Sequence, residues 1–245
     1  MSKLSLNFGY TKVSPKEKTK LVQSVFSDVS EKYDLMNDIM SLGGHRIWKR
    51  IFADIINVQP NDKIIDVGSG TGDIARFILK TKIETNLHLL DLNNKMLEIG
   101  KLNLNKKYKN ISFHQGSAEK LKFKDNFFDK YIISFCLRNI TNIEDSIKEA
   151  FRVIKPGGTY YCLEFSTPNT YIISKFYNSY KNNFIPLLGK IISQNEKSYR
   201  YLSESIDLFP NQKKLKKLLE INGFINVSYL DLFDGIVAIH KGYKV

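Results

Sequence analysis

The stretch Lys63-Ile-Ile-Asp-Val-Gly-Ser-Gly-Thr-Gly-Asp73 decides the fold class of this chain. An apolar, β-branched run stops at three alternate glycines, Gly68, Gly70 and Gly72, and a helical pattern begins at Asp73. This order opens a nucleotide-binding βαβ unit, because glycines permit positive φ and let a ligand approach the main chain. The spacing G-x-G-x-G differs from the G-x-G-x-x-G of dinucleotide enzymes, so the motif alone also fits a glycine turn that binds nothing.

The rest of the chain continues the alternation of strands and helices. Further strands are predicted at 86–92, 111–115, 128–135 and 159–165, the last after a turn formed by Lys155-Pro-Gly-Gly158. A helix and two strands, 225–230 and 235–240, follow as a closing antiparallel hairpin. We expect an α/β fold with a seven-stranded, mostly parallel sheet, an antiparallel C-terminal strand, and ligand at the carboxyl edge.

The whole chain, 1–245, is predicted to form a single domain. Residues 1–60 form an N-terminal helical cap that starts as a mobile arm (Met1 to Lys20), and 61–165 form the cofactor-binding core. A helical insert at 166–207 precedes the C-terminal helix and strand pair at 208–245. The insert is too long and too aromatic for a plain connection. Its rings either pack onto the core or form an apolar lid over a large, flat substrate.

Composition restricts the classes of partner. The net charge is +12, but it comes mostly from lysine, so solvated lysine faces are favoured over a nucleic-acid surface, with an anionic membrane surface second. Two distant cysteines, Cys136 and Cys162, and four scattered histidines predict reduced thiols and no metal site. No apolar run approaches the roughly 18 residues of a membrane span, and no secretory signal is visible, so we expect a cytoplasmic protein.

Two segments after strands carry candidate ligand contacts. Asp91 ends the second strand about twenty residues after the glycine turn, where an acid meets ribose hydroxyls in this architecture. It could instead cap the next helix. The loop Gly116-Ser117-Ala118-Glu119 can hydrogen-bond the edge of an adenine through its main chain.

Together these features resemble a class I S-adenosylmethionine-dependent methyltransferase, with its Rossmann-like fold. A closer resemblance is to the ubiquinone/menaquinone biosynthesis C-methyltransferase family, and it covers nearly the whole chain, from about Phe8 to Val245. The matching segments are Lys32-Tyr-Asp-Leu-Met-Asn-Asp38, Gly44-His-Arg-Ile-Trp-Lys-Arg50, Leu137-Arg-Asn-Ile140, Leu163-Glu-Phe-Ser166, Ser198-Tyr-Arg-Tyr-Leu-Ser-Glu-Ser-Ile206 and His240-Lys-Gly-Tyr243. Ser69 departs from the pattern, since many members carry glycine there.

The resemblance implies methyl transfer from S-adenosylmethionine to a ring carbon of a polyprenylated benzoquinol or naphthoquinol. Asp66 is expected to orient the glycine loop and to reach the methionine amino group. The residues implied to bind the cofactor are Asp66, Gly68, Gly70, Thr71, Asp91, Ser117, Ala118 and Ser134.

A ring carbon becomes a nucleophile when a neighbouring hydroxyl loses its proton, so the site must stabilise a phenolate-like oxygen. Arg138 and Asn139 are the first candidates for that role, although Arg138 could instead only pair with a structural acid such as Glu164. The second group of candidates, for proton acceptance or hydroxyl contacts, consists of Tyr33, Asp34, Asn37 and His45.

The resemblance also implies partners: a polyprenylated quinol, a peripheral membrane surface, and a homodimer or a quinone-biosynthesis complex, with no nucleic acid. The membrane would be the inner membrane or, alternatively, the mitochondrial membrane on its matrix face. Four other functions stay open: a nicotinamide-dependent oxidoreductase, a nucleic-acid methyltransferase, another small-molecule or lipid methyltransferase, and a non-catalytic scaffold of a quinone-biosynthesis complex.

Overall fold

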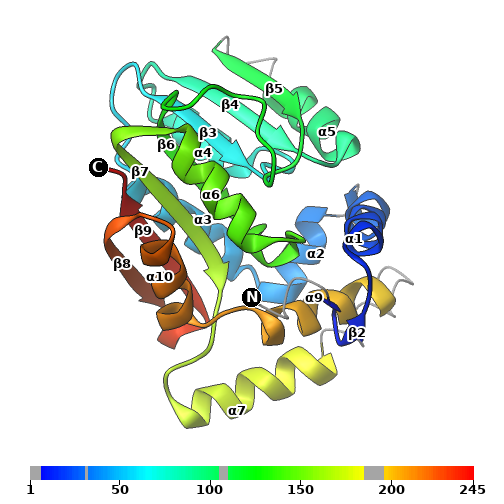
Figure 1. Cartoon of the computed structure of the whole chain (residues 1–245). Coiled ribbons are helices and arrows are strands. Elements are labelled where there is room, and N and C mark those ends of the chain that lie inside the picture. Colours follow the sequence, from blue (N-terminus) through cyan, green and yellow to red (C-terminus); the bar gives the residue numbers. More distant parts are fainter. Residues whose placement is uncertain (1–6, 31–32, 105–109, 185–195) are drawn as a thin grey trace.

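The centre of the molecule is a seven-stranded sheet, seen in a computed structural model that describes residues 7–30, 33–104, 110–184 and 196–245 (Figure 1). The strand order is β5-β4-β3-β6-β7-β9-β8. Only β9 pairs antiparallel with its neighbours β7 and β8, which confirms the predicted mostly parallel sheet. The strands are β3 (Lys63–Val67), β4 (Asn86–Asp91), β5 (Ile111–Gln115), β6 (Phe128–Ser134), β7 (Ile154–Phe165), β8 (Ile225–Leu232) and β9 (Val237–Tyr243).

Buried strand residues alternate between the two faces of the sheet, as the period of two requires. Ile65 and Val67 of β3 join a core with α6 (Ile143–Val153) and α10 (Gln212–Ile221). Ile64, one position earlier, belongs to the opposite core with α3 (Gly44–Ile56) and α4 (Asp73–Lys80), to which α5 (Asn94–Leu104) adds Leu104. The sheet is therefore buried on both faces.

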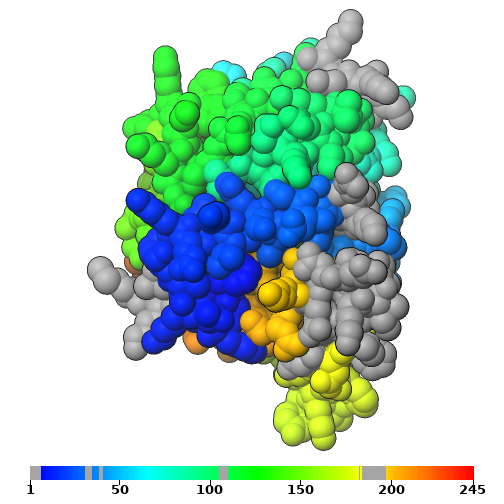
Figure 2. Space-filling view, turned by 90° about the vertical axis from the view of Figure 1, so that its right-hand side faces the viewer, coloured from blue at the N-terminus to red at the C-terminus, as the bar shows by residue number. Residues whose placement is uncertain are grey.

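A third apolar cluster lies beyond the carboxyl edge of the parallel strands. It joins α1 (Pro15–Val29) and α2 (Tyr33–Ser41) to α9 (Glu196–Leu208), elements from opposite ends of the chain (Figures 1 and 2). Between β7 and α9 the chain forms α7 (Tyr171–Ser179) and a π-helical turn, Tyr180–Phe184. Residues 171–184 and 196–207 of the predicted insert are thus helical, and 166–170 form the loop that leads into them. The cluster consists of Val25, Val29, Met36, Tyr199, Tyr201 and Leu202.

Residues 7–20 differ from the predicted mobile arm. They form a short hairpin, β1 (Asn7–Phe8) and β2 (Thr11–Lys12), and then the first turn of α1. The ring of Phe8 stacks on Tyr201 with centroids 4.1 Å apart. Ser14 caps α1 by accepting a hydrogen bond from the backbone N–H of Glu17, and Pro15 occupies the first turn. A contact 193 positions away in sequence orders the segment, so no local pattern could predict it.

The predicted turn at Lys155–Gly158 lies inside β7. Ile154 pairs with Phe128 and Thr159 pairs with Lys130, so four residues bulge opposite Asp129 alone. Gly157 takes a φ of +82° there. The glycines therefore accommodate a bulge within one strand and do not separate a helix from a new strand.

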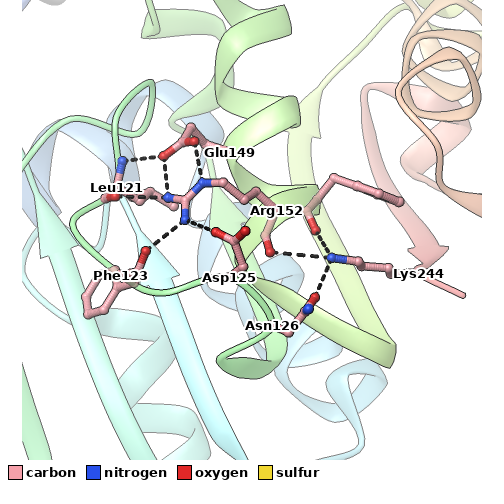
Figure 3. Close-up of polar contacts among 8 residues, drawn as sticks. Leu121, Phe123, Asp125, Asn126, Glu149, Arg152 and Lys244 are labelled. Carbon is pink, nitrogen blue, oxygen red and sulfur yellow. Dashed lines mark hydrogen bonds and ion pairs between the residues drawn. The ribbon is translucent and has the colours of Figure 1, made fainter.

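A polar network at the opposite edge of the sheet fixes the end of the chain (Figure 3). Arg152, at the end of α6, donates hydrogen bonds to Glu149, to Asp125 and to the carbonyls of Leu121 and Phe123. Lys244 donates to Asn126 Oδ1 and the Phe151 carbonyl at 2.7 Å each. The network lies away from the carboxyl edge and its role is structural.

Among the helices of the described residues, none is both long enough and apolar enough to cross a membrane.

Candidate active site

The glycine loop between β3 and α4 has the backbone geometry that its sequence predicts. Gly68 and Gly70 have φ values of +68° and +54°. A Cβ at Gly68 would lie 2.2 Å from Cys136 Sγ, so this position admits no side chain. The N–H of Gly70 donates to Asp91 Oδ2 at 2.8 Å and so joins the loop to the end of β4.

Three adjoining cavities of the described residues lie at the carboxyl edge of the sheet. One of them, here called the main cleft, contains about 800 Å³ of space free of protein atoms, including its open mouth. α1 forms one wall, and the ends of β3, β4 and β6 and the loop after β5 form the others. Its lining includes Thr19, Val22, Gln23, Phe26, Gly68, Gly70, Asp91, Asn93, Met96, Ser117, Ala118, Ser134, Phe135 and Asn139.

Asp91 faces the main cleft and the glycine loop. Its Oδ1 accepts the N–H of Asn93 at 2.8 Å, while the side chain of Asn93 accepts the N–H of Met96 and so caps α5. The capping function suggested for Asp91 therefore belongs largely to Asn93. Burial raises the pKa of Asp91, and the N–H donors of Asn93 and Gly70 act against that rise.

A second cavity, the loop cavity, adjoins the main cleft under the glycine loop. It is lined by Lys49, Asp66, Gly68, Ser69, Gly70, Thr71, Asp73, Ile74 and Ser134. Both carboxylate oxygens of Asp66 and the hydroxyls of Ser69, Thr71 and Ser134 are buried, and they have no hydrogen-bond partner within the described residues. Burial first, and the nearby Asp91 second, raise the pKa of Asp66 to about 7. Such unpartnered groups around one cavity indicate a polar ligand group.

A third cavity, the side cavity, shares Phe26 and Phe135 with the main cleft. Apolar side chains form most of its wall, with a few polar groups among them, as in sites for small ring compounds. It is lined by Phe26, Met36, Asn37, Ser41, His45, Phe135, Arg138, Phe165 and Leu202.

Arg138 lines the side cavity and forms a buried ion pair. Its Nη1 donates to Glu164 Oε1 at 2.6 Å and to the carbonyl of Phe135 at 2.9 Å. The pairing with Glu164 that the sequence left open is therefore present. Phe135 has a φ of +51°, and both Arg138 and Asn139 hold this strained turn through its carbonyl.

Asn139 connects the core to the insert. Its Oδ1 accepts a hydrogen bond from the phenol of Tyr201 on α9 at 3.0 Å. Asn139 itself lines the main cleft. A polar side chain of the main cleft is thus fixed by a residue 62 positions away in sequence.

The segment from α2 to α3 supplies the other predicted residues. His45 and Asn37 line the side cavity, and His45 Nε2 lies 2.9 Å from Asp38 Oδ1. Tyr33 and Asp34 are the first residues of α2, but their side chains lie outside the described part of the chain. The roles of these two residues stay predictions.

The sequence interpretation missed two contributions to this region. Lys49, buried on α3, pairs with Asp73 at 2.7 Å and lines the loop cavity; the charge within an apolar helical pattern was the available signal. α1 was expected only as part of the N-terminal helical cap, yet Asn93 Nδ2 donates to the Gln23 carbonyl and to Ser27 Oγ, which holds α1 against the main cleft.

Sheet order, glycine loop and the acid after β4 together define a class I S-adenosylmethionine-dependent methyltransferase. Solved structures share this fold. A SAM-dependent methyltransferase from Aquifex aeolicus gives a TM-score of 0.58 at 14% identity, and the match covers 96% of this chain and 100% of that one. Phosphoethanolamine N-methyltransferase 2 of Haemonchus contortus, solved with S-adenosyl-L-methionine, gives a TM-score of 0.60 at 14% identity and covers 80% of this chain and 52% of its own.

The chain belongs to the ubiE/COQ5 methyltransferase family, whose model matches residues 12–244. A relative from Rickettsia bellii, named ubiquinone/menaquinone biosynthesis C-methyltransferase UbiE, is 46% identical over 249 residues, which cover 98% of each chain. The protein of that name from Vibrio parahaemolyticus is 43% identical over 241 residues, 97% of this chain and 93% of its own. The protein is therefore an enzyme that uses S-adenosylmethionine, as the sequence resemblance implied.

The residues present fit this cofactor. Its amino-acid end carries an ammonium and a carboxylate, and the loop cavity offers the buried carboxylate of Asp66 beside unpartnered hydroxyls and Lys49. Its nucleoside end requires an acceptor for ribose hydroxyls and a loop for the base. Asp91 and Ser117-Ala118 line the main cleft and have the groups that would meet these requirements.

Proposed function

We propose that this protein methylates a ring carbon of a polyprenylated benzoquinol or naphthoquinol in ubiquinone or menaquinone biosynthesis. The observation that carries the proposal is a family match over nearly the whole chain, including the segments that surround the side cavity. The side cavity adjoins the main cleft and has mainly apolar walls, which suits a flat ring next to the cofactor.

The bound cofactor supplies an electrophilic methyl group on a sulfonium. Asp66, Ser69, Thr71 and Ser134 hold its amino-acid end in the loop cavity, and Asp91 holds the ribose. The glycines of the loop would let its main chain approach the cofactor closely. These residues fix the orientation of the methyl group, and orientation contributes a large share of the barrier reduction.

Arg138 and Asn139 stabilise the oxygen of the acceptor. A guanidinium in a buried position interacts strongly with a developing negative charge. Arg138 has a buried carboxylate as its partner, so its charge is compensated by Glu164 when no phenolate is bound. Asn139 offers an amide whose orientation Tyr201 fixes.

α7 is the part of the insert that we assign to membrane contact. Tyr171, Ile172 and Phe176 are 80%, 64% and 74% exposed, and the helix projects from the lower end of the molecule (Figure 2). The chain has a net charge of +12, which favours an anionic lipid surface. Association as a homodimer or within a quinone-biosynthesis complex stays a prediction, as does the division into cap, core, insert and C-terminal unit.

Purified protein tests the reaction. It is incubated with methyl-labelled S-adenosylmethionine and with a prenylated naphthoquinol or benzoquinol lacking one ring methyl. We expect label on a ring carbon by mass spectrometry. Label on oxygen or nitrogen, or on unrelated lipids only, would favour another small-molecule or lipid methyltransferase. An Asp91→Ala variant that sustains quinone synthesis in cells would favour the alternative function, a non-catalytic scaffold of a quinone-biosynthesis complex.

Vesicle flotation tests the membrane surface. The double variant Ile172→Ser and Phe176→Ser should lose binding to vesicles that contain anionic lipid. Leu102→Ser on α5 is the matched control, since Leu102 is 69% exposed and lies far from α7. Equal flotation of both variants would contradict the assignment to α7.

A further inference from the structure

His45 lines the side cavity and forms a hydrogen bond with Asp38. The residue is 5% exposed, at the start of α3, and its Nε2 is 2.9 Å from Asp38 Oδ1. Arg46 donates to both oxygens of Asp38 at 2.7 Å. This fork keeps the pKa of Asp38 well below its usual range, so the carboxylate is ionised and accepts. The hydrogen of the neutral ring therefore resides on Nε2.

The second ring nitrogen is left as a lone-pair acceptor. Nδ1 of His45 is buried and has no hydrogen-bond partner within the described residues. A buried, unpartnered acceptor calls for a ligand or functional explanation. His45 and Arg138 both line the side cavity, so a hydroxyl bound in that cavity has a base and a guanidinium among its neighbours.

Burial and the neighbouring Lys49 favour the neutral form of His45. Burial first, and Lys49 second, lower its pKa, whereas Asp38 and Asp73 act in the opposite direction. Lys49 comes from the next turn of α3, Asp73 from α4, and Arg138 faces the same cavity from the turn after β6. α1 and α9 contribute Phe26 and Leu202 to that cavity. At neutral pH the imidazole is ready to accept a proton.

We propose that His45 is a catalytic base that takes the proton of the acceptor's ring hydroxyl on Nδ1, with Asp38 as its positioning residue. This inference rests on the proposed function and names the proton acceptor within it. The O–H bond breaks, its proton goes to Nδ1, and its electron pair stays on the oxygen beside Arg138. The oxygen can then donate electron density into the ring.

The ring carbon bonds to the methyl group while the carbon–sulfur bond breaks, with its electron pair left on sulfur. The carbon then loses its hydrogen as a proton to solvent, which restores the aromatic ring. The oxygen recovers a proton from the imidazolium. The balance is one methyl gained by the ring and one proton released.

The test compares His45→Gln with the wild type in the full-length protein. The glutamine amide can still donate to Asp38 but has no basic nitrogen. We expect kcat to fall about 100-fold or more, the usual range for a lost general base, while KM and the dissociation constant of S-adenosylmethionine change less than about threefold. The wild-type kcat should rise with pH and level off once the imidazole is neutral, whereas the kcat of the variant should rise with pH without levelling off.

Three further variants complete the design. His114→Gln, a histidine on β5 away from the side cavity, should keep the wild-type kcat and profile. Asp38→Asn removes a contact that raises the pKa of His45, so it should move the low-pH limb to lower pH. His45→Asn replaces His45→Gln if calorimetry shows the latter unfolded.

Two outcomes separate this inference from the proposed function. A wild type that methylates a quinol, with a folded His45 variant that keeps kcat within threefold and the same profile, would overturn the inference alone. A wild type that methylates no quinol would overturn the proposed function and the inference with it.

Discussion

The phenol of Tyr201 donates a hydrogen bond to Asn139 Oδ1 at 3.0 Å, and so joins α9 to the carboxyl edge of β6. The ring of Phe8 stacks on the other side of this tyrosine, nearly parallel at 7°. A catalytic candidate is therefore held in place by two segments outside the sheet.

Tyr201→Phe should affect turnover more than binding. The ring and its stacking remain, but Asn139 loses its partner, which costs about 1 kcal/mol of unfolding free energy. We expect kcat to fall about tenfold, with an unchanged affinity for S-adenosylmethionine by calorimetry. Tyr229→Phe on the edge strand β8 is the control. An unaltered kcat in the Tyr201 variant would remove the positioning function of this contact.

Variants of the buried Arg138–Glu164 pair distinguish a contribution of Arg138 to stability from a contribution to catalysis. Arg138→Met leaves Glu164 buried and unpaired, so unfolding free energy should drop by about 3–5 kcal/mol. Adding Glu164→Gln removes that charge and should restore most of the stability. Turnover should stay low in both variants, with cofactor binding retained in the double variant. Recovery of kcat along with stability would mean that Arg138 serves the fold alone.

Asp91→Ala should weaken cofactor binding. The variant loses the ribose acceptor and also the anchor of Gly70, and two charge-assisted hydrogen bonds contribute about 3 kcal/mol or more, equivalent to a 100-fold weaker affinity. Equilibrium titration measures this loss. Glu98→Ala on the surface of α5 should bind normally. Wild-type affinity in the Asp91 variant would place the ribose elsewhere.

The raised pKa of Asp66 predicts that cofactor binding releases a proton. Its pKa of about 7 leaves the carboxyl protonated below neutrality in the free enzyme. An ammonium in the loop cavity favours the ionised form, so binding at about pH 6 should release about one proton. Calorimetry in buffers of different ionisation enthalpy measures it, and Asp66→Asn should abolish it. Equal release from both proteins would separate Asp66 from the ammonium.

The same group makes stability depend on pH. Folding raises the pKa of Asp66 from 3.8 to about 7, so the native state binds more protons between these values. Stability contributed by this residue is therefore lost as the pH rises through that window, by up to about 4 kcal/mol. The Asp66→Asn variant should lack this decline when chemical unfolding is followed from acid to neutral pH.

Arg152→Ala should destabilise the protein without touching the site. The side chain joins α6 to the loop before β6, away from the carboxyl edge (Figure 3). We expect a loss of about 2 kcal/mol in unfolding free energy and wild-type kcat below the transition. Lys216→Ala, in a surface pair with Glu220, is the near-neutral control. A changed kcat in the fully folded Arg152 variant would show that this network is coupled to the candidate active site at the carboxyl edge of the sheet.

The sheet and the cofactor end of the site could be predicted from local signals. Gly68 and Gly70 need positive φ, and Asp91 follows from strand order, because parallel strands bring their carboxyl ends to one edge. Those inferences require only spacing along the chain and the alternation of strand with helix.

The other side of the site depends on contacts between distant segments. The hydrogen bond of Asn139 to Tyr201 and the stacking of Phe8 have no signature within a sequence window. The pairing of Lys49 with Asp73 likewise depends on how α3 packs on α4. Residue type indicated that something polar was buried there, and tertiary packing decided the partner.

The apolar cluster of α1, α2 and α9 also sets the order in which a growing chain can become active. Val25 and Met36 leave the ribosome early, but Tyr199 and Leu202 follow after most of the sheet has been made. The glycine loop and Asp91 can meet while synthesis continues, whereas the side cavity lacks Leu202 until the last fifth of the chain emerges. A nascent chain can therefore form the glycine loop and its contact with Asp91 before the cavity proposed for the acceptor is complete.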